Sequence, residues 1–215
     1  KGLFISAYVS LKSIVKYIDL THILIYCNKT NNAKLITKYI NLILEKNLVE
    51  ISKEDLYYID LHSDSSVNKD TCIDDFKTSK YGIINCVYEF GEGFNCPEIN
   101  GVVFSENMES EIRICQCSLR ANRLDSNFPN KIAYYMIPWI DTDNWGEDKT
   151  PFDKVKKIIS KLGNEDGMIQ QKIVLSELKP KKPKKPKTEN EDDGFILDDD
   201  DDELNKIILR LKNKN

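Results

Sequence analysis

The stretch YGIINCVYEFGEGFNCPEINGVVFSEN, residues 81–107, decides the fold class of this chain. It holds an apolar run at 82–88, a turn rich in glycine and proline at 91–97, and a second apolar run at 101–104. Two short apolar runs around such a turn are typical of buried strands in a parallel α/β sheet. Ligands of parallel sheets bind in loops beyond the strand ends, so the turn is a candidate ligand site.

The segment SEIRICQCSLRANR, residues 110–123, contains three of the four arginines of the chain, Arg113, Arg120 and Arg123. Lysine supplies almost all of the remaining positive charge. The planar guanidinium group matches two phosphate oxygens at once, which the ammonium group of lysine does not. The cluster therefore indicates phosphate recognition, and a surface helix with ordinary ion pairs is the alternative.

A helix over this segment would have two different faces. Spacings of three and four residues place four side chains on the phosphate-binding face: Arg113, Gln116, Arg120 and Arg123. The same periodicity assigns three residues to a packing face: Ile112, Cys115 and Leu119. We expect the arginine side chains to be exposed and the packing face to be buried.

Apolar runs and helical patterns alternate over the rest of residues 20–140. The apolar runs predict further strands at 22–27, 56–64 and 131–140. The helical patterns predict helices at 11–18, 28–46 and 72–80. This alternation is typical of a parallel sheet with crossover helices.

Two of these segments resemble known motifs. GEGFNCP at 91–97 is similar to motif V of superfamily 2 helicases and translocases, commonly E-G-x-D-x-P. QCSLRANR at 116–123 resembles their motif VI, commonly Q-x-x-G-R-x-x-R. Asn95 stands where the family usually has Asp, and Leu119 stands where it usually has Gly.

The resemblance is to the C-terminal lobe of these proteins, and it implies a three-layer RecA-like α/β fold over residues 1–145, with a parallel sheet and helices on both faces. A helical extension is expected at 146–178, with one helix beginning at Pro151 and another at 167–178. Residues 179–202 should form a disordered linker, rich first in lysine and proline and then in acids. Residues 203–215 should form an amphipathic helix that docks on this lobe or on a protein partner.

The same resemblance implies ATP and Mg²⁺ as cofactors, both held mainly by a first RecA-like lobe supplied in cis or in trans. This chain contains no G-x-x-x-x-G-K-[ST] loop and no D-E-x-x box, so we expect it to be inactive alone. The expected catalytic residues are Arg120 and Arg123, which would reach the γ-phosphate, and Gln116, which would organise that contact. The expected nucleotide-binding residues are Gly91, Gly93 and Asn95. The expected contacts with a single strand of DNA or RNA are Asn28, Lys29, Cys86 and Val87.

Composition limits the classes of partner. The tail accounts for the net charge of −4, with six lysines at 179–187 and ten acids at 189–203, so any contact with nucleic acid must be local. The six cysteines include no C-x-x-C pair, so no metal site is expected, and their use as reduced thiols predicts an intracellular location in cytoplasm or nucleus. No apolar run is long enough for a membrane span, so no membrane partner is expected. Heavy use of Lys, Asn and Ile favours an AT-rich genome, such as that of a large DNA virus.

Two hypotheses of function remain at this stage. In the first, the chain is the C-terminal motor lobe of an ATP-dependent helicase or translocase, and the retained glutamine and arginines of motif VI favour it. In the second, it is a catalytically degenerate lobe that scaffolds a transcription, replication or restriction complex, and Asn95 and Leu119 favour that.

Overall fold

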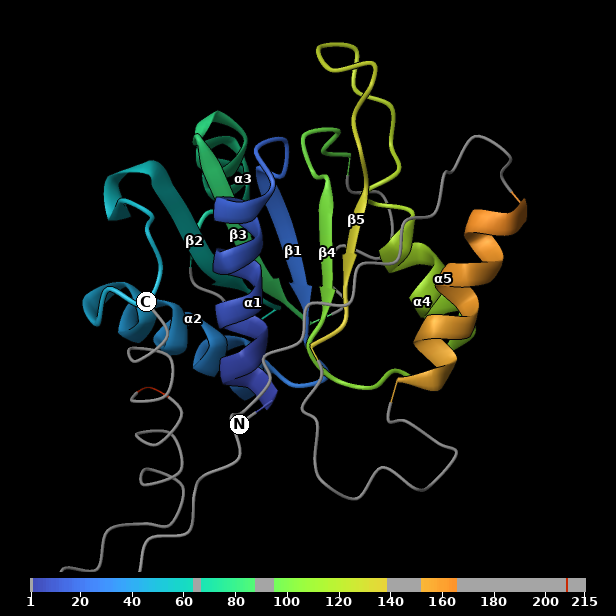
Figure 1. Ribbon diagram of the computed structural model, residues 1–215, viewed down its shortest axis with the longest axis horizontal. Helices are drawn as coiled ribbons and strands as arrows, with labels where there is room; N and C mark the ends of the chain where they lie inside the picture. The colour runs from blue at the N-terminus through green and yellow to red at the C-terminus, as the bar shows by residue number, and fades with distance from the viewer. Residues whose placement is uncertain (1, 64–66, 88–94, 139–151, 166–207, 209–215) are drawn as a thin grey trace, which may run out of the picture.

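The chain forms a five-stranded parallel sheet with the strand order β2-β3-β1-β4-β5 (Figure 1). The computed structural model describes residues 2–63, 67–87, 95–138, 152–165 and 208. The strands are β1 (His22–Tyr26), β2 (Leu56–Leu61), β3 (Tyr81–Cys86), β4 (Gly101–Phe104) and β5 (Tyr134–Met136). Every neighbouring pair is parallel. The predicted α/β fold class is therefore confirmed.

Helices cover both faces of the sheet. They are α1 (Gly2–Lys16), α2 (Thr30–Glu45), α3 (Lys69–Thr78), α4 (Glu111–Ser118) and α5 (Asp153–Glu165), with a short 3₁₀ helix η1 (Lys53–Asp55) before β2. α1 and α2 contribute to one buried cluster, and α3, α4 and α5 contribute to a second. Figure 1 shows α1 and α2 in front of the sheet. These are the three layers that the sequence predicts.

The central strand β1 is buried along its whole length. Its side chains alternate between the two clusters, with Ile23 and Ile25 in the first and Leu24 and Tyr26 in the second. A strand covered on both faces needs an unbroken apolar run, which is why HILIY can occupy the centre of a parallel sheet.

Several predicted boundaries are wrong. α1 begins at Gly2, nine residues before the predicted start at 11, because Ser6 and Ser10 are compatible with a buried helix. The Ser6 hydroxyl donates to the Gly2 carbonyl over 3.0 Å, and that of Ser10 donates to the Ser6 carbonyl over 2.7 Å, so the polar groups of both side chains are satisfied inside the helix. α3 also begins early, since Asn68 caps it by accepting from the amides of Asp70 and Thr71.

The C-terminal elements are described in part. α5 begins at Asp153, close to the predicted start, and buries Val155 in the second cluster. The predicted strand at 131–140 is limited to Tyr134–Met136. The predicted helix at 167–178 and the linker at 179–202 lie outside the described residues. Of the predicted docking helix only Ile208 is described, and it packs in the first cluster with 7% of its surface exposed.

A close approach at Gly82 joins β1, β3 and α3. Gly82 lies opposite His22 in the β1–β3 register. His22 contacts Phe76 edge to face at 4.8 Å between ring centroids, and its Nε2 lies 2.9 Å from the Phe76 carbonyl oxygen. A Cβ atom at position 82 would lie 2.5 Å from Phe76 Cδ2 and 2.8 Å from His22 Cδ2. Only glycine leaves room for both rings.

We expect Gly82→Ala to lower the free energy of unfolding by about 1–3 kcal/mol, because the new methyl group must displace two packed rings. Urea unfolding followed by circular dichroism measures this change. Gly2→Ala is the matched control, since a Cβ atom there meets no heavy atom within 4 Å. We expect the control to shift stability by no more than about 0.5 kcal/mol. Equal stability of the two variants would contradict the packing described here.

Candidate functional site

The arginine segment is only partly helical. α4 begins after Ser110, whose side-chain oxygen accepts from the Arg113 amide at 3.4 Å, and it ends at Ser118. Leu119 caps the helix by donating its amide to the Cys115 carbonyl at 2.9 Å. Arg120 and Arg123 therefore lie in the turns beyond the helix, and their directions do not follow the helical repeat.

The predicted faces of this segment are wrong. Ile112 is 71% exposed and Leu119 is 48% exposed, although both were assigned to the packing face. The buried apolar positions are instead Ile114, Cys117 and Ala121, and Ser118 and Arg120 are buried as well. Spacings of three and four residues fit this set as well, so periodicity alone could not select the buried face.

Arg120 is buried, with 5% of its surface exposed, so the expectation that both candidate arginine fingers are exposed is wrong. It lies near Tyr26, the last residue of β1, and near Cys117. Burial raises the pKa of Tyr26 well above its ordinary value, and the Arg120 charge acts in the opposite direction. Burial likewise raises the pKa of Cys117 to about 12. The Arg120 side chain is therefore buried between β1 and the turn that follows α4.

Arg123 is half-buried, and its Nη1 donates to Asn95 Oδ1 over 2.7 Å. The two residues are 28 positions apart in the sequence. This hydrogen bond brings together the two segments that resemble motifs V and VI. Gly91 and Gly93 lie outside the described residues, so the contact is made by the part of the turn that is described.

The remaining catalytic candidate, Gln116, is half-buried on α4. It is on the same helix as Arg113, which is exposed. The structure therefore places one candidate inside the packing, Arg120, and leaves two candidates partly accessible, Gln116 and Arg123.

The candidate strand-binding residues lie after β1 and β3. Asn28 and Lys29 follow β1 and are exposed. Cys86 ends β3 and is fully buried, so its side chain cannot contact a strand. Val87 is half-buried and packs against the first cluster. Parallel strands end at one edge of the sheet, so these residues share that edge.

Glu106 occupies the same edge, and the sequence analysis missed it. Its Oε2 accepts from the Asn28 amide and its Oε1 accepts from Asn32 Nδ2, both at 2.8 Å. Asn28 Nδ2 also donates to the Asn107 carbonyl at 2.9 Å. These contacts join residues that are 74 to 79 positions apart in the sequence, and no local sequence pattern around Glu106 predicts them. Its negative charge opposes a phosphate group placed against Asn28.

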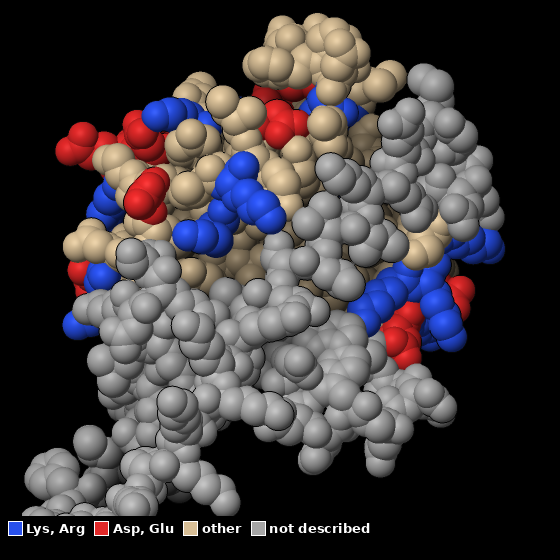
Figure 2. Space-filling model, viewed as in Figure 1, with Lys and Arg blue, Asp and Glu red and all other residues tan. Residues whose placement is uncertain are grey.

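Charged side chains on the described surface are mixed in sign. Figure 2 shows basic and acidic side chains close together over the described part of one face. Among the described residues, one ion pair joins Lys80 Nζ to Asp55 Oδ2 at 2.7 Å. The expectation that any nucleic-acid contact is local rather than global remains a prediction.

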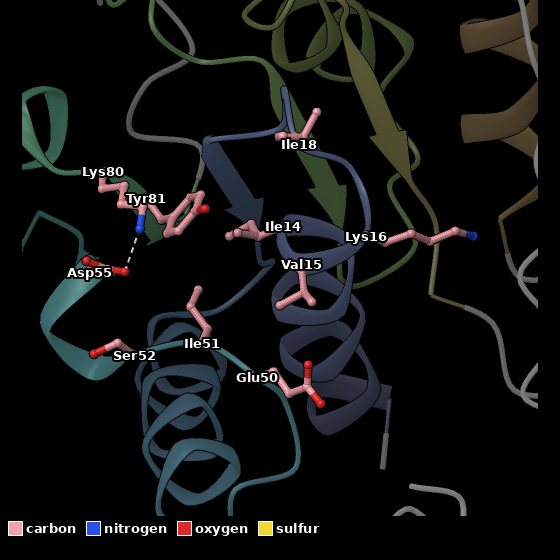
Figure 3. Close-up of a pocket in the computed structure, with 10 residues that line it drawn as sticks. All are labelled: Ile14, Val15, Lys16, Ile18, Glu50, Ile51, Ser52, Asp55, Lys80 and Tyr81. Carbon is pink, nitrogen blue, oxygen red and sulfur yellow. Dashed lines mark hydrogen bonds and ion pairs between the residues drawn. The ribbon is translucent and has the colours of Figure 1, made fainter.

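A separate pocket of about 300 Å³ lies between the end of α1 and the starts of β2 and β3. Figure 3 shows Ile14, Ile51 and Tyr81 around its apolar part, with the Lys80–Asp55 pair at the side. It shares no residue with the segments that resemble motifs V and VI. It therefore does not belong to the candidate nucleotide site.

Comparisons with known proteins support the fold. No family model and no curated protein matches this sequence. Among solved structures, the ATP-dependent Type ISP restriction-modification enzyme LlaBIII bound to DNA matches with a TM-score of 0.53 and 15% identity. The match covers 78% of this chain and 12% of that one.

Two further matches have lower TM-scores. Domain 2 of the DEAD-box helicase Mss116p bound to an RNA duplex gives 0.48 at 15% identity, over 64% of this chain and 49% of that one. T4 UvsW gives 0.48 at 14% identity, over 77% of this chain and 33% of that one. The parallel sheet with helices on both faces agrees with the predicted RecA-like α/β fold, and the match to the LlaBIII enzyme supports that fold. The matches give no support to a viral origin.

We expect Arg120→Ala and Arg123→Ala to differ in stability. Loss of the buried Arg120 should lower the free energy of unfolding by about 1–3 kcal/mol, because its packing beside Tyr26 is lost. Loss of Arg123, which is half-buried, should cost less than about 1 kcal/mol. Urea unfolding of both variants tests this, and equal losses would contradict the different burial of the two side chains.

Proposed function

We propose that this chain is the C-terminal motor lobe of an ATP-dependent nucleic-acid helicase or translocase, and that it acts with a first RecA-like lobe supplied in cis or in trans. The observation that supports this most directly is the Arg123–Asn95 hydrogen bond. It joins the two segments whose counterparts, in the family that the sequence resembles, contact nucleotide. The fold, shared with C-terminal RecA-like lobes, supports the same proposal.

Arg123 is the residue best placed to reach a γ-phosphate. Its guanidinium is accessible in part and already aligned by Asn95. The turn that contains it is fixed at its start by the buried Arg120, so Arg120 acts here through packing rather than by touching phosphate. Gln116 would organise the contact from α4. Stabilisation of charge on the transferring phosphoryl group is the chemistry that such an arginine supplies.

The first lobe would make most of the contacts with nucleotide and Mg²⁺, and this lobe would make fewer. Asn95 has an amide that can hydrogen-bond a ribose hydroxyl, and Gly91 and Gly93 would allow close approach of the backbone. The described residues contain no group of three or more His, Cys, Asp or Glu side chains that could hold a metal ion. As the resemblance implies, the first lobe would make most of the Mg²⁺ contacts, and the ion would supply positive charge that offsets the charge on the phosphate groups.

The strand of DNA or RNA would pass along the carboxyl edge of the sheet. Asn28, Lys29 and Val87 would face it, and Cys86 would contribute only its backbone, because its side chain is buried. Closure of the lobes on ATP would move this edge relative to the first lobe, which is how hydrolysis would become movement along a strand. No helix in the described part of the chain is long and apolar enough to span a membrane.

A scaffold without catalysis is the second candidate function. Glu106 favours it, because its carboxylate is bonded to Asn28 at the edge where a phosphate backbone would lie. The burial of Arg120 favours it too, since one of the two candidate arginine fingers is committed to packing. In this reading the lobe, or a protein partner of its C-terminal tail, holds a complex together and no ATP is turned over.

We expect Arg123→Ala, in a protein with both lobes, to lower nucleic-acid-stimulated ATP turnover by about 10³-fold or more, the range reported for arginine fingers. Arg123→Lys should restore little of it, because a point charge lacks the two-pronged geometry. Lys12→Ala is the control, since Lys12 is an exposed cation on α1, outside the segments assigned to nucleotide or strand, and should leave turnover unchanged. Turnover is measured by phosphate release with and without single-stranded DNA or RNA.

Two outcomes would count against the motor. Wild-type turnover in Arg123→Ala would remove this residue from the reaction. A wild-type protein that binds nucleic acid or partners but hydrolyses no ATP would favour the scaffold.

A further inference from the structure

We propose that Lys131 is a positioning residue for the candidate nucleotide-binding residues. It holds the loop 95–99 in place, so that the hydrogen bond between Asn95 and Arg123 is kept. This inference rests on the proposed function for its catalytic consequence. The resemblance to motifs V and VI does not include Lys131, which lies eight residues beyond Arg123.

The contact itself is direct. Lys131 Nζ donates to the Pro97 carbonyl at 2.6 Å and to the Ile99 carbonyl at 3.0 Å. Both carbonyls belong to the segment that begins with Asn95, and the Ile99 amide closes a turn on the Cys96 carbonyl at 3.3 Å. Hydrogen bonds from a charged donor are stronger than neutral ones. One side chain therefore fixes two points of the loop.

The position of Lys131 is set by a folded backbone. Asp125 Oδ1 accepts from the Asn127 amide at 2.8 Å, and the Asp125 carbonyl accepts from the Phe128 amide at 3.1 Å. The Phe128 carbonyl in turn accepts from the Lys131 amide at 3.0 Å. These successive turns bring the chain from Arg123 back to the loop 95–99. The segment from Arg123 to Lys131 is therefore bonded to the loop 95–99 at both of its ends, by the Arg123–Asn95 hydrogen bond and by the two hydrogen bonds of Lys131.

The surroundings of Lys131 are partly enclosed and of mixed charge. Burial lowers the pKa of Lys131, and the Arg123 charge acts in the same direction. Asp125, Cys96 and Glu98 raise it. Two cations thus bond to one short loop, Arg123 at the Asn95 side chain and Lys131 at the Pro97 and Ile99 carbonyls. Cys96 and Ile99 also hold the loop through their burial in the second cluster, and Lys131 adds two charged hydrogen bonds to the Arg123 contact, which a bound phosphate would compete for.

Cys96 offers a direct test on this 215-residue chain. It lies in the loop, with 1% of its surface exposed, and burial raises the pKa of its thiol to about 12. We expect Lys131→Met to speed alkylation of Cys96 by iodoacetamide at least tenfold, and Lys131→Arg to speed it much less. Cys27 and Cys117 are internal controls, since both are buried and burial raises each pKa to about 12. Mass spectrometry of the digested protein reads out all three sites.

The catalytic consequence is tested in the protein with both lobes. Lys131→Met should lower kcat for ATP at least tenfold, and it should lower the preference for ATP over 2′-deoxy-ATP toward that of Asn95→Ala. The double variant, with Lys131→Met and Asn95→Ala, should have a kcat no lower than that of the more severe single variant, because both changes act through the same contact. Lys80→Met is the matched control, a lysine whose hydrogen bond to Asp55 lies at another part of the lobe.

Each outcome decides one question. Unchanged labelling of Cys96 in Lys131→Met would show that Lys131 does not hold the loop. Faster labelling of all three cysteines would show a general loss of structure. Either result would overturn the proposal. Faster labelling of Cys96 alone with unchanged ATP kinetics, in an active protein, would also overturn the positioning role. A wild-type protein without ATP turnover would overturn the proposed function, and the Cys96 result would still decide whether Lys131 holds the loop.

Discussion

The position of β1 at the centre of a parallel sheet constrains the rest of this structure. A central strand that is buried on both faces must be covered by helices on both sides, and parallel neighbours must be joined by crossovers. The crossover helix α2 and the preceding α1 therefore lie on one face, and α3, α4 and α5 lie on the other. The loops after β1, β3 and β4 are brought to one edge as a result. The candidate site is a consequence of this arrangement.

Most of the fold could be predicted because it depends on local pattern. The runs HILIY and YGIINC predict strands, and the periodicity of 28–46 predicts a helix, which the structure confirms with small changes of boundary. The prediction failed where the pattern was ambiguous. Two sets of positions in 110–123 have helical spacing, and only the surrounding core selects Ile114 and Cys117 over Ile112 and Leu119. The helix also ends at Ser118, so a phase extended to Arg120 and Arg123 had no physical basis.

For the candidate site, the sequence indicates residue types but not the contacts that join them. The resemblance to motifs V and VI singled out the segments that contain Asn95 and Arg123, which a hydrogen bond joins in the structure. It gave no indication of Glu106 or Lys131, because their contacts depend on the tertiary structure and join residues 32 to 78 positions apart. Such residues supply hydrogen bonds to backbone groups, and a backbone group has no sequence signature. Resemblance therefore identifies side chains that could touch a ligand more readily than those that hold them.

Long-range hydrogen bonds lie beyond both ends of α4. Before its start, Glu106 and Asn107 are bonded to Asn28, and beyond its end Arg123 is bonded to Asn95. Eight helical residues span about 12 Å, and a helix of that length behaves as a stiff rod. Residues 107–110 connect α4 to the contacts of Asn28, and the turns at 119–123 connect it to Arg123. The same helix thus lies between the loop that follows the central strand β1 and the turn that carries Arg123.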